Sequence, residues 1–369
     1  RHGDEFVPYH TRTRDTLHSF YQRLFMNMQT LKAIWKANIP PMVWMCSPLW
    51  VGSVILGLDG EVPEWTPVIL VLAAVALLMA IAEFANTYTD RHEDKVYFPS
   101  NPLVTGEILA VTAKKAFIVQ NIVAGAIIVA LALVTLDYRP IIALLVCWFI
   151  CLAYSMPPFR LKETPASPFI LALGIVLQPL AAWLVVAQLN SFMIAFAVFL
   201  FTYTLGFGIT QKFRKTTHAL KAGLIKVEPD GSIYDIRTIG FTLKVKTAMV
   251  LEAFTTLGAF IMIPIFWHLD IFRASLSIAL LTAPLLLTVL SIFLRIIDPI
   301  GNGPKCALVM TMAWEFIGLI LLAVALASLI HWGYAILVCI IIVMVSILLT
   351  KTIHPFQLKK AITAPWQEL

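Results

Sequence analysis

Three polar side chains, Asn86, Asp90 and Asp94, follow one another at intervals of four residues. On an α-helix this spacing places side chains on one face, each one turn from the next. Two carboxylates stacked in this way repel each other unless a cation lies between them. Oxygen ligands of this kind suit a hard ion such as Mg2+, which proteins usually hold through one or two carboxylates together with the phosphates of a ligand. The spacing therefore predicts a Mg2+ site with Asn86, Asp90 and Asp94 as ligands.

This acid motif lies where a long apolar segment, 66–87, ends, and it continues into a polar loop that reaches Asn101 and Glu107. Ionisable side chains at the end of a membrane span are expensive unless they are paired, so they indicate a functional site by default. Arg91 and Lys95 lie among the acids and are candidate contacts to an anionic ligand.

The composition excludes a soluble domain. Of the 369 residues, 60% are apolar and 13% charged, with a mean hydropathy of +0.86, whereas soluble domains are roughly 45–50% apolar and about 25% charged. The five cysteines lie in or beside apolar segments and match neither a disulfide framework nor a metal-binding spacing. The basic pI of about 9.0 needs no nucleic-acid partner, because membrane topology explains it.

The elements that carry the motif are expected to be membrane-spanning helices. Ten apolar segments reach the length of a span, roughly 17–25 residues: 38–58, 66–87, 113–136, 140–156, 168–188, 191–210, 247–267, 272–294, 307–329 and 333–350. The predicted fold is an all-α, multi-pass bundle of nine to ten spans that forms one domain over 38–350. Residues 1–37 are expected to be a cytoplasmic segment with an amphipathic helix on the membrane surface over 10–36, and 351–369 a cytoplasmic tail.

The distribution of charge predicts the orientation. With the N-terminus in the cytoplasm, the cytoplasmic segments and their flanks contain 25 of the 27 Lys and Arg residues, and the opposite side contains Arg139 and Arg273 alone. This asymmetry is the positive-inside bias of membrane proteins. Three of the cytoplasmic loops hold the unusual polar sequence: 88–112, 157–167 and 211–246.

One of these loops is acidic and two are basic, which suits a polyanion bridged by a metal. The basic candidates are Arg160, Lys162, Lys212 and Arg214. A leaving diphosphate needs Mg2+ on its oxygens and Lys or Arg to neutralise the remaining charge. An apolar bundle beside such a site is expected to receive a hydrocarbon chain and to exclude water from a carbocation. A lipid diphosphate is therefore the predicted substrate, with membrane lipid around the bundle.

The acid motif and the loop after the fourth span resemble motifs of the UbiA superfamily of intramembrane prenyltransferases. The first motif continues as Asn101-Pro-Leu-Val-Thr-Gly106-Glu107, similar to the Arg-Pro-Leu-x-Ser-Gly turn of that family. Tyr154-Ser-Met-Pro-Pro-Phe-Arg160-Leu-Lys162 resembles the family segment Tyr-Ser-x-Pro-Pro-x-Arg-x-Lys. The resemblance covers about residues 30–330 and implies the UbiA-like fold, an isoprenyl diphosphate as substrate, Mg2+ as cofactor and a catalytic role for Tyr154.

The chain departs from the family pattern in two places. Thr87 stands where the family has Asp, and the expected place of the second motif, Asp-x-x-x-Asp, reads Gln211-Lys212-Phe213-Arg214-Lys215. Further on, Asp235-Ile-Arg-Thr-Ile-Gly is similar to the tail that follows the second motif in the family. Two alternatives stay open: either Asp235, with Asp230 or Glu228, supplies a second metal-binding and catalytic face, or Lys212 and Arg214 provide positive charge in place of a metal.

Three functions are compatible with these motifs. The first is transfer of a prenyl group to an acceptor, either aromatic or lipid. The second is a UbiA-type terpene cyclase, in which the double bonds of the substrate attack its own cation. The third is a transporter or scaffold without chemistry. Glu252 and Glu315, inside the seventh and ninth spans, are expected either to face a cavity or to bond to neighbouring helices.

Overall fold

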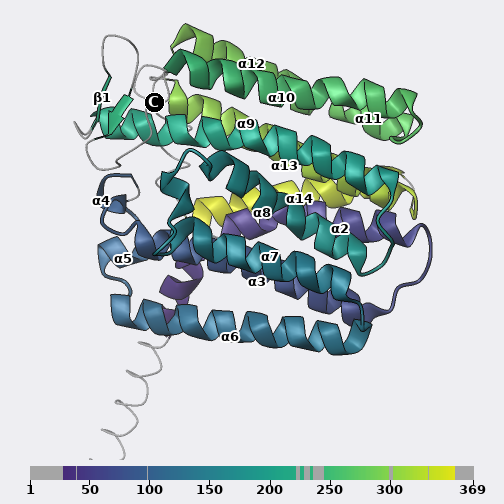
Figure 1. Ribbon diagram of the computed structural model, residues 1–369, viewed down its shortest axis with the longest axis horizontal. Coiled ribbons are helices and arrows are strands. Elements are labelled where there is room, and N and C mark those ends of the chain that lie inside the picture. Colours follow the sequence, from purple (N-terminus) through teal and green to yellow (C-terminus); the bar gives the residue numbers. More distant parts are fainter. Residues whose placement is uncertain are drawn as a thin grey trace, which may run out of the picture.

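The computed structural model describes residues 28–353 apart from 39, 98, 222–224, 228–232, 236–244, 299–301 and 331. These residues form a bundle of helices that run along one common direction (Figure 1). A helix over 28–37 comes first. The further elements are α2 (Pro40–Leu58), α3 (Trp65–Thr89), α4 (Asp94–Tyr97), α5 (Pro102–Thr105), α6 (Ala110–Thr135), α7 (Tyr138–Ser155), the 3-10 helix η1 (Leu161–Glu163), α8 (Ser167–Leu184), α9 (Ser191–Lys221), β1 (Ile225–Val227), β2 (Ile233–Asp235), α10 (Val245–His268), α11 (Ala274–Leu280), α12 (Ala283–Ile297), α13 (Gly303–Ala327) and α14 (Trp332–Ile353).

The predicted all-α membrane fold is confirmed. Within the described part of the chain, 8 helical segments are long and apolar enough to cross a membrane, and α2 adds a shorter apolar helix, Val43–Leu58. With α14, helices occupy each of the ten predicted segments. The expected span 272–294 is among them as Ala274–Ile297, and a turn at residues 281–282 divides it into α11 and α12.

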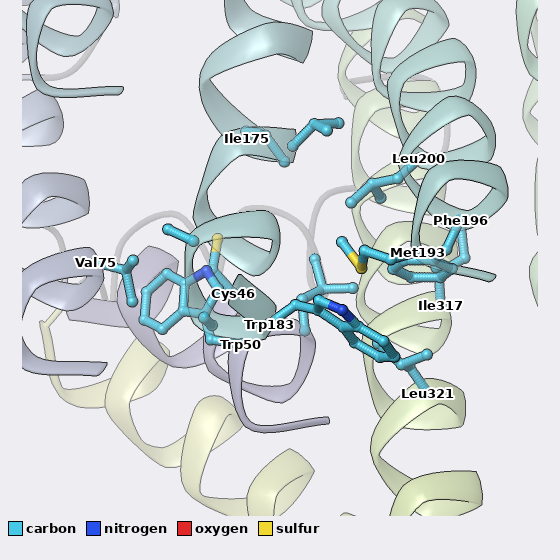
Figure 2. Packing of buried hydrophobic residues seen from close by; sticks show 14 of the residues in the cluster. Cys46, Trp50, Val75, Ile175, Trp183, Met193, Phe196, Leu200, Ile317 and Leu321 are labelled. Carbon is cyan, nitrogen blue, oxygen red and sulfur yellow. The ribbon is translucent and has the colours of Figure 1, made fainter. Parts of the chain in front are cut away.

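Apolar side chains between the helices form a continuous core. Trp50 of α2, Val75 of α3, Ile175 of α8 and Phe196 of α9 are among its buried members (Figure 2). A methyl group at Gly52 of α2 would lie 3.1 Å from a backbone nitrogen of α13, so the absence of a side chain allows these two helices to approach closely. Because α2 packs on α13, the first and later spans of the bundle are in contact.

The polar loops lie at one end of the bundle. Figure 1 shows α4, α5 and β1 at the same end, where α3 finishes and α6 begins. The strands β1 and β2 form an antiparallel hairpin within the loop 211–246, with Ile225 opposite Asp235. The fold thus brings the acidic loop and one basic loop to a common end.

Only the end of the predicted surface helix 10–36 lies within the described residues. The helix over 28–37 buries Ala33 and Ala37 in a small cluster with Phe84 of α3, while Leu31 and Trp35 are exposed. This arrangement is amphipathic, as the sequence predicts for this part. Residues 1–27 and 354–369, including most of the predicted tail, lie outside the described residues.

Candidate active site

The acid motif spans the end of α3 and the start of α4. Asn86 lies in the last turn of α3, Asp90 follows its end, and Asp94 is the first residue of α4. The helix expected to run through all three is interrupted by a turn over residues 90–93. Backbone hydrogen bonds of helical spacing cross this turn: the N–H of Asp90 donates to the carbonyl of Asn86 over 2.9 Å, and the N–H of Asp94 to that of Asp90 over 2.7 Å. The three residues therefore follow one another at nearly helical spacing without sharing one helix.

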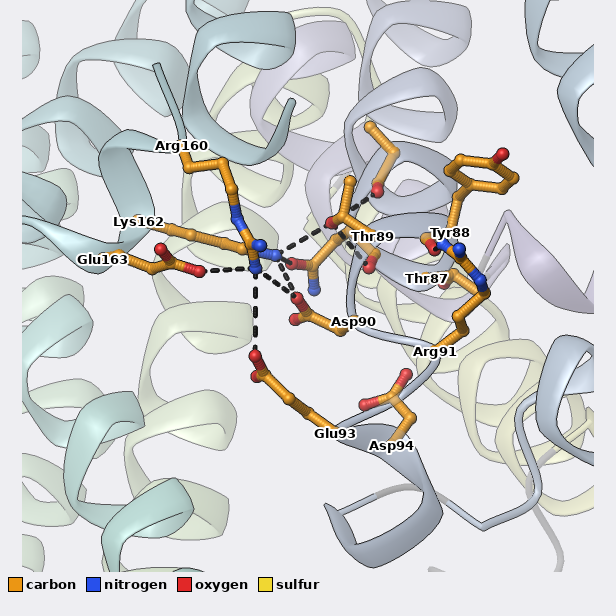
Figure 3. Close-up of polar contacts among 12 residues, drawn as sticks. Thr87, Tyr88, Thr89, Asp90, Arg91, Glu93, Asp94, Arg160, Lys162 and Glu163 are labelled. Carbon is orange, nitrogen blue, oxygen red and sulfur yellow. Dashed lines mark hydrogen bonds and ion pairs between the residues drawn. The ribbon is translucent and has the colours of Figure 1, made fainter. Parts of the chain in front are cut away.

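The ammonium group of Lys162 lies among the oxygen atoms of the acid motif (Figure 3). Its Nζ donates to Asn86 Oδ1 over 3.1 Å and to Thr89 Oγ1 over 3.0 Å, and it forms an ion pair with Asp90 Oδ1. Lys162 is 6% exposed and Asp90 2% exposed, so water and salt screen this pair far less than a surface pair. Three oxygen atoms thus converge on one cation at this point.

Arg160 approaches the same carboxylate from the loop between α7 and α8. Its Nη2 lies 3.9 Å from Asp90 Oδ1 and 3.8 Å from Glu93 Oε1, and it also pairs with Glu163 (Figure 3). Its backbone has a left-handed φ of 41°, which is uncommon for a residue other than glycine. This conformation turns the chain at the start of η1. The name Asp90 cluster is used below for Asn86, Thr89, Asp90, Arg160 and Lys162.

Asn101 fixes the second carboxylate of the motif. Its Nδ2 donates to Asp94 Oδ2 over 2.7 Å and to the carbonyl of Thr87 over 3.1 Å, while its Oδ1 accepts from the N–H of Leu103. The side chain of Asn101 is fully buried and caps α5. Sequence reasoning gave Asn101 no role of its own. An Asn directly before Pro at the start of a helix is a recognisable N-cap signal, but its reach to Asp94 requires the fold.

Lys212, at the end of α9, contacts the loop that carries Lys162. Its Nζ donates a hydrogen bond to the backbone carbonyl of Lys162. The neighbouring Gln211 donates to Thr311 of α13 over 3.4 Å. The end of α9 is therefore in contact with the loop that carries Lys162 and with α13.

Two further candidate residues are placed beside the Asp90 cluster. Arg91 turns back onto Tyr88: its Nη1 donates to the Tyr88 carbonyl over 2.8 Å, and its guanidinium carbon lies 4.9 Å from the ring centroid (Figure 3). Lys95 is exposed on α4. These placements of Arg91 and Lys95 differ from those of Lys162 and Arg160, which form ion pairs with Asp90.

The remaining candidates are less fully defined. Tyr154 is half-buried in the last turn of α7. The backbone of Asp235 belongs to β2, but its side chain, the side chain of Arg214 and all of Glu228 and Asp230 lie outside the described part of the structure. The choice between an acidic and a basic second face therefore stays a prediction.

The donor set of the Asp90 cluster fits a hard divalent ion. Carboxylate and amide oxygens from Asp90 and Asn86 already surround one cation, the Lys162 ammonium. Within the described residues, no three His, Cys, Asp or Glu side chains gather closely enough to hold a metal by themselves. Mg2+ bound here would therefore complete its six ligands with water and the phosphates of a ligand, as is usual for this ion.

The bundle and its oxygen-lined cation site define an integral multi-pass membrane protein whose polar site lies at one end of its helices. The model of the UbiA prenyltransferase family matches residues 45–310, and the chain belongs to this family. Family membership supports prenyltransferase activity in general. The family match includes α3, α9 and the loop between α7 and α8.

Solved structures with the same fold accompany this family match. A structure described for the biosynthesis of digeranylgeranylglyceryl phosphate synthase in membranes has a TM-score of 0.58 at 18% identity, covering 79% of this chain and 97% of that one. A UbiA homologue from Archaeoglobus fulgidus bound to GPP and Mg2+ has a TM-score of 0.53 at 20% identity, covering 78% and 99%. At these identities the similarity shows the fold alone. A comparison with curated proteins found no match.

Proposed function

We propose that this protein binds an isoprenyl diphosphate and Mg2+ at the Asp90 cluster, ionises the substrate and transfers its prenyl group to an acceptor. The observation that carries this proposal is the buried Asp90 carboxylate. It pairs with Lys162 and lies 3.9 Å from Arg160, and the Lys162 ammonium also contacts the amide oxygen of Asn86. Such a site can hold a metal and neutralise a polyanion at the same time. The relative solved with GPP and Mg2+ supports this ligand class.

In the proposed reaction, some residues of this site bind the metal and others contact the diphosphate. Asn86, Asp90 and Asp94 would hold Mg2+, which when bound neutralises charge that develops on the leaving diphosphate. Lys162 and Arg160 are placed to donate to diphosphate oxygens as the C1–O bond breaks and both of its electrons pass to the diphosphate. The nucleophilic atom of the acceptor then bonds to C1 and gives up a proton. Tyr154, Lys95 and Arg91 are assigned to substrate contact on the family resemblance or on sequence position.

The apolar bundle suits the hydrocarbon part of this substrate. Buried aromatic rings such as Phe199, Tyr203 and Phe207 follow the interior face of α9, and water exclusion protects a carbocation. With the basic loops on the cytoplasmic side, the diphosphate would enter from the cytoplasm and the prenyl chain would lie within the membrane.

Cyclisation without an acceptor is the second candidate. It is favoured by the change at the second motif, where Gln211 and Lys212 contact α13 and the loop of Lys162. In this reaction a double bond of the substrate attacks C1 of its own cation, and loss of a proton or addition of water ends the reaction.

One experiment separates these reactions. Purified protein in detergent is incubated with C10, C15 and C20 prenyl diphosphates and Mg2+, first without and then with an aromatic or lipid acceptor. Product that appears only with the acceptor supports transfer, whereas hydrocarbon or terpene alcohol without acceptor supports cyclisation. If diphosphate is released under neither condition, the transporter or scaffold hypothesis replaces both.

The same assay tests the assignment of the metal ligands. Asp90→Ala removes the carboxylate on which the cluster converges, and we expect turnover to fall at least about 100-fold, as for removal of a group that acts in the transition state. Lys114→Gln, an exposed cation at the same end of the bundle, is the matched control and should keep full activity. Full activity in Asp90→Ala would contradict the assignment.

A further inference from the structure

A second charged pair, Glu252 and Arg295, is buried between α10 and α12. Arg295 in the last turn of α12 places its Nε 2.8 Å from Glu252 Oε2 of α10. Glu252 is 1% exposed and Arg295 2% exposed. Neither residue belongs to the Asp90 cluster, and the reaction proposed above uses neither of them.

Stability alone gives a weak reason for this pair. Removing two charges from water costs several kcal/mol per ion, and apolar residues of similar volume are often equally stable or better. Inside a membrane protein such residues are rare and face other protein groups. The position of the pair therefore calls for a role in fixing geometry.

The pair is connected to α9 at one residue. Glu252 Oε1 accepts a hydrogen bond of 2.6 Å from Thr210 Oγ1, and Thr210 is fully buried. One turn earlier on α9, a methyl group at Gly206 would lie only 3.1 Å from the backbone carbonyl of Glu252. Helices α9 and α10 are thus in backbone contact beside the pair, and the hydrogen bond sets the rotation of α9 at that contact.

Two residues after Thr210, α9 reaches the active site. Lys212 donates to the carbonyl of Lys162, and the Lys162 ammonium contacts Asp90 and Asn86. A change in the rotation of α9 at Thr210 would move Lys212 and with it the loop of Lys162.

We infer that Glu252 and Arg295 are positioning residues for Lys162, acting through Thr210 and Lys212 of α9. The inference rests on the proposed function, because its consequence is that diphosphate binding depends on a pair that touches no substrate. In this view the end of α9, where the acids of the second motif are absent from the sequence, supports Lys162 in the loop between α7 and α8.

The test compares binding of pyrophosphate with Mg2+ to the full chain by calorimetry. In Glu252→Met/Arg295→Met both charges are replaced together, so no unpaired ion is left in the bundle. We expect about tenfold weaker binding, since loss of a residue that orients a ligand-binding group typically costs 10–100-fold. In Glu252→Gln/Arg295→Met an amide oxygen still accepts from Thr210, and most of the affinity should return.

A double-mutant comparison tests the path through Lys212. Lys212→Met should also weaken binding about tenfold, and its combination with Glu252→Met/Arg295→Met should stay near tenfold rather than reach a hundredfold, because both changes act on one route. Thr202→Val is the matched control: it removes a 2.8 Å hydrogen bond within α9, from Thr202 to the carbonyl of Val198, that is not on this route, and it should leave binding unchanged.

The outcomes separate the two proposals. If the natural protein binds no pyrophosphate with Mg2+, the proposed function is wrong. If it binds and Glu252→Met/Arg295→Met binds equally well, the positioning inference is overturned and the proposed function stands. A hundredfold loss in the combined variant, or an equal loss in Thr202→Val, also overturns the inference.

Discussion

The Mg2+ proposed to bind at Asp90 would compete with Lys162 for the same carboxylate. The Lys162 ammonium contacts Asp90, Asn86 and Thr89, and these are the oxygen atoms nearest to any cation bound there. For Mg2+ to reach Asp90, the ammonium must move, and a diphosphate offers it new acceptors. Lys162→Met should therefore strengthen binding of a metal alone while it weakens binding of diphosphate.

The expected change in metal affinity follows from the contacts of the Lys162 ammonium, which a metal does not have to displace in the variant. A hydrogen bond between charged partners contributes about 1.5–3 kcal/mol, and 1.4 kcal/mol corresponds to a factor of ten in affinity. We therefore expect Mn2+, used in place of Mg2+, to bind Lys162→Met about 10–100-fold more tightly than the natural protein. The substitution leaves Asp90 buried without its ammonium partner, which costs about 3–5 kcal/mol of stability, and bound Mn2+ should restore part of that loss.

The assay is an electron paramagnetic resonance titration of free Mn2+ against the full chain in detergent, without diphosphate. Thermal unfolding with and without Mn2+ shows whether the variant is folded. Asp90→Asn/Lys162→Met is the matched control, because it removes the carboxylate together with the ammonium and should bind Mn2+ more weakly than Lys162→Met. If folded Lys162→Met binds Mn2+ no more tightly than the natural protein, the competition at Asp90 is refuted.

Three further predictions concern other parts of the structure. Asn101→Ala removes the α5 cap and the 2.7 Å hydrogen bond to Asp94; thermal unfolding should show a loss of about 1 kcal/mol and the Mn2+ titration a weaker affinity. Gly206→Ala places a methyl group 2.3 Å from a side-chain carbon of α10, and the overpacked contact should cost about 1–3 kcal/mol in denaturant unfolding. A hydrogen bond from Arg139 lowers the pKa of Asp137; its contribution to stability is therefore present above the pKa of the unfolded chain and is lost as the pH falls through the folded pKa. Thermal unfolding of Asp137→Asn should accordingly show a lower melting temperature than the natural protein near neutral pH, and no difference in strong acid.

Hydrophobic length predicted the helices because a span must satisfy every backbone group internally. Length alone did not predict where a helix breaks. Between α11 and α12, Pro284 lies in the first turn of α12, where its ring removes a backbone donor and disfavours helical conformation in the residue before it. The predicted span 272–294 contains this signal, so the break was within reach of the sequence.

The site was predictable in its members more than in its contacts. Asp90 and Lys162 were identified from separate motifs, and the fold brings them together. Sequence spacing could not reveal that Lys162 contacts Asp90. Nor could it reveal that Arg91, the residue after Asp90, contacts Tyr88. That outcome depends on how the loop after α7 packs on the end of α3, and such packing is a tertiary property.

The place of the family's second acidic motif can now be interpreted through its neighbours. Gln211 contacts α13, and Lys212 contacts the loop of Lys162, so these two side chains join the end of α9 to its neighbours. Arg160 and Lys162, which belong to the loop between α7 and α8, place positive charge beside Asp90. Under the proposed function, these two side chains would neutralise charge on the leaving diphosphate. This division of roles favours an enzyme in which ionisation relies strongly on Arg160 and Lys162, whether an acceptor or the substrate's own double bond then captures the cation.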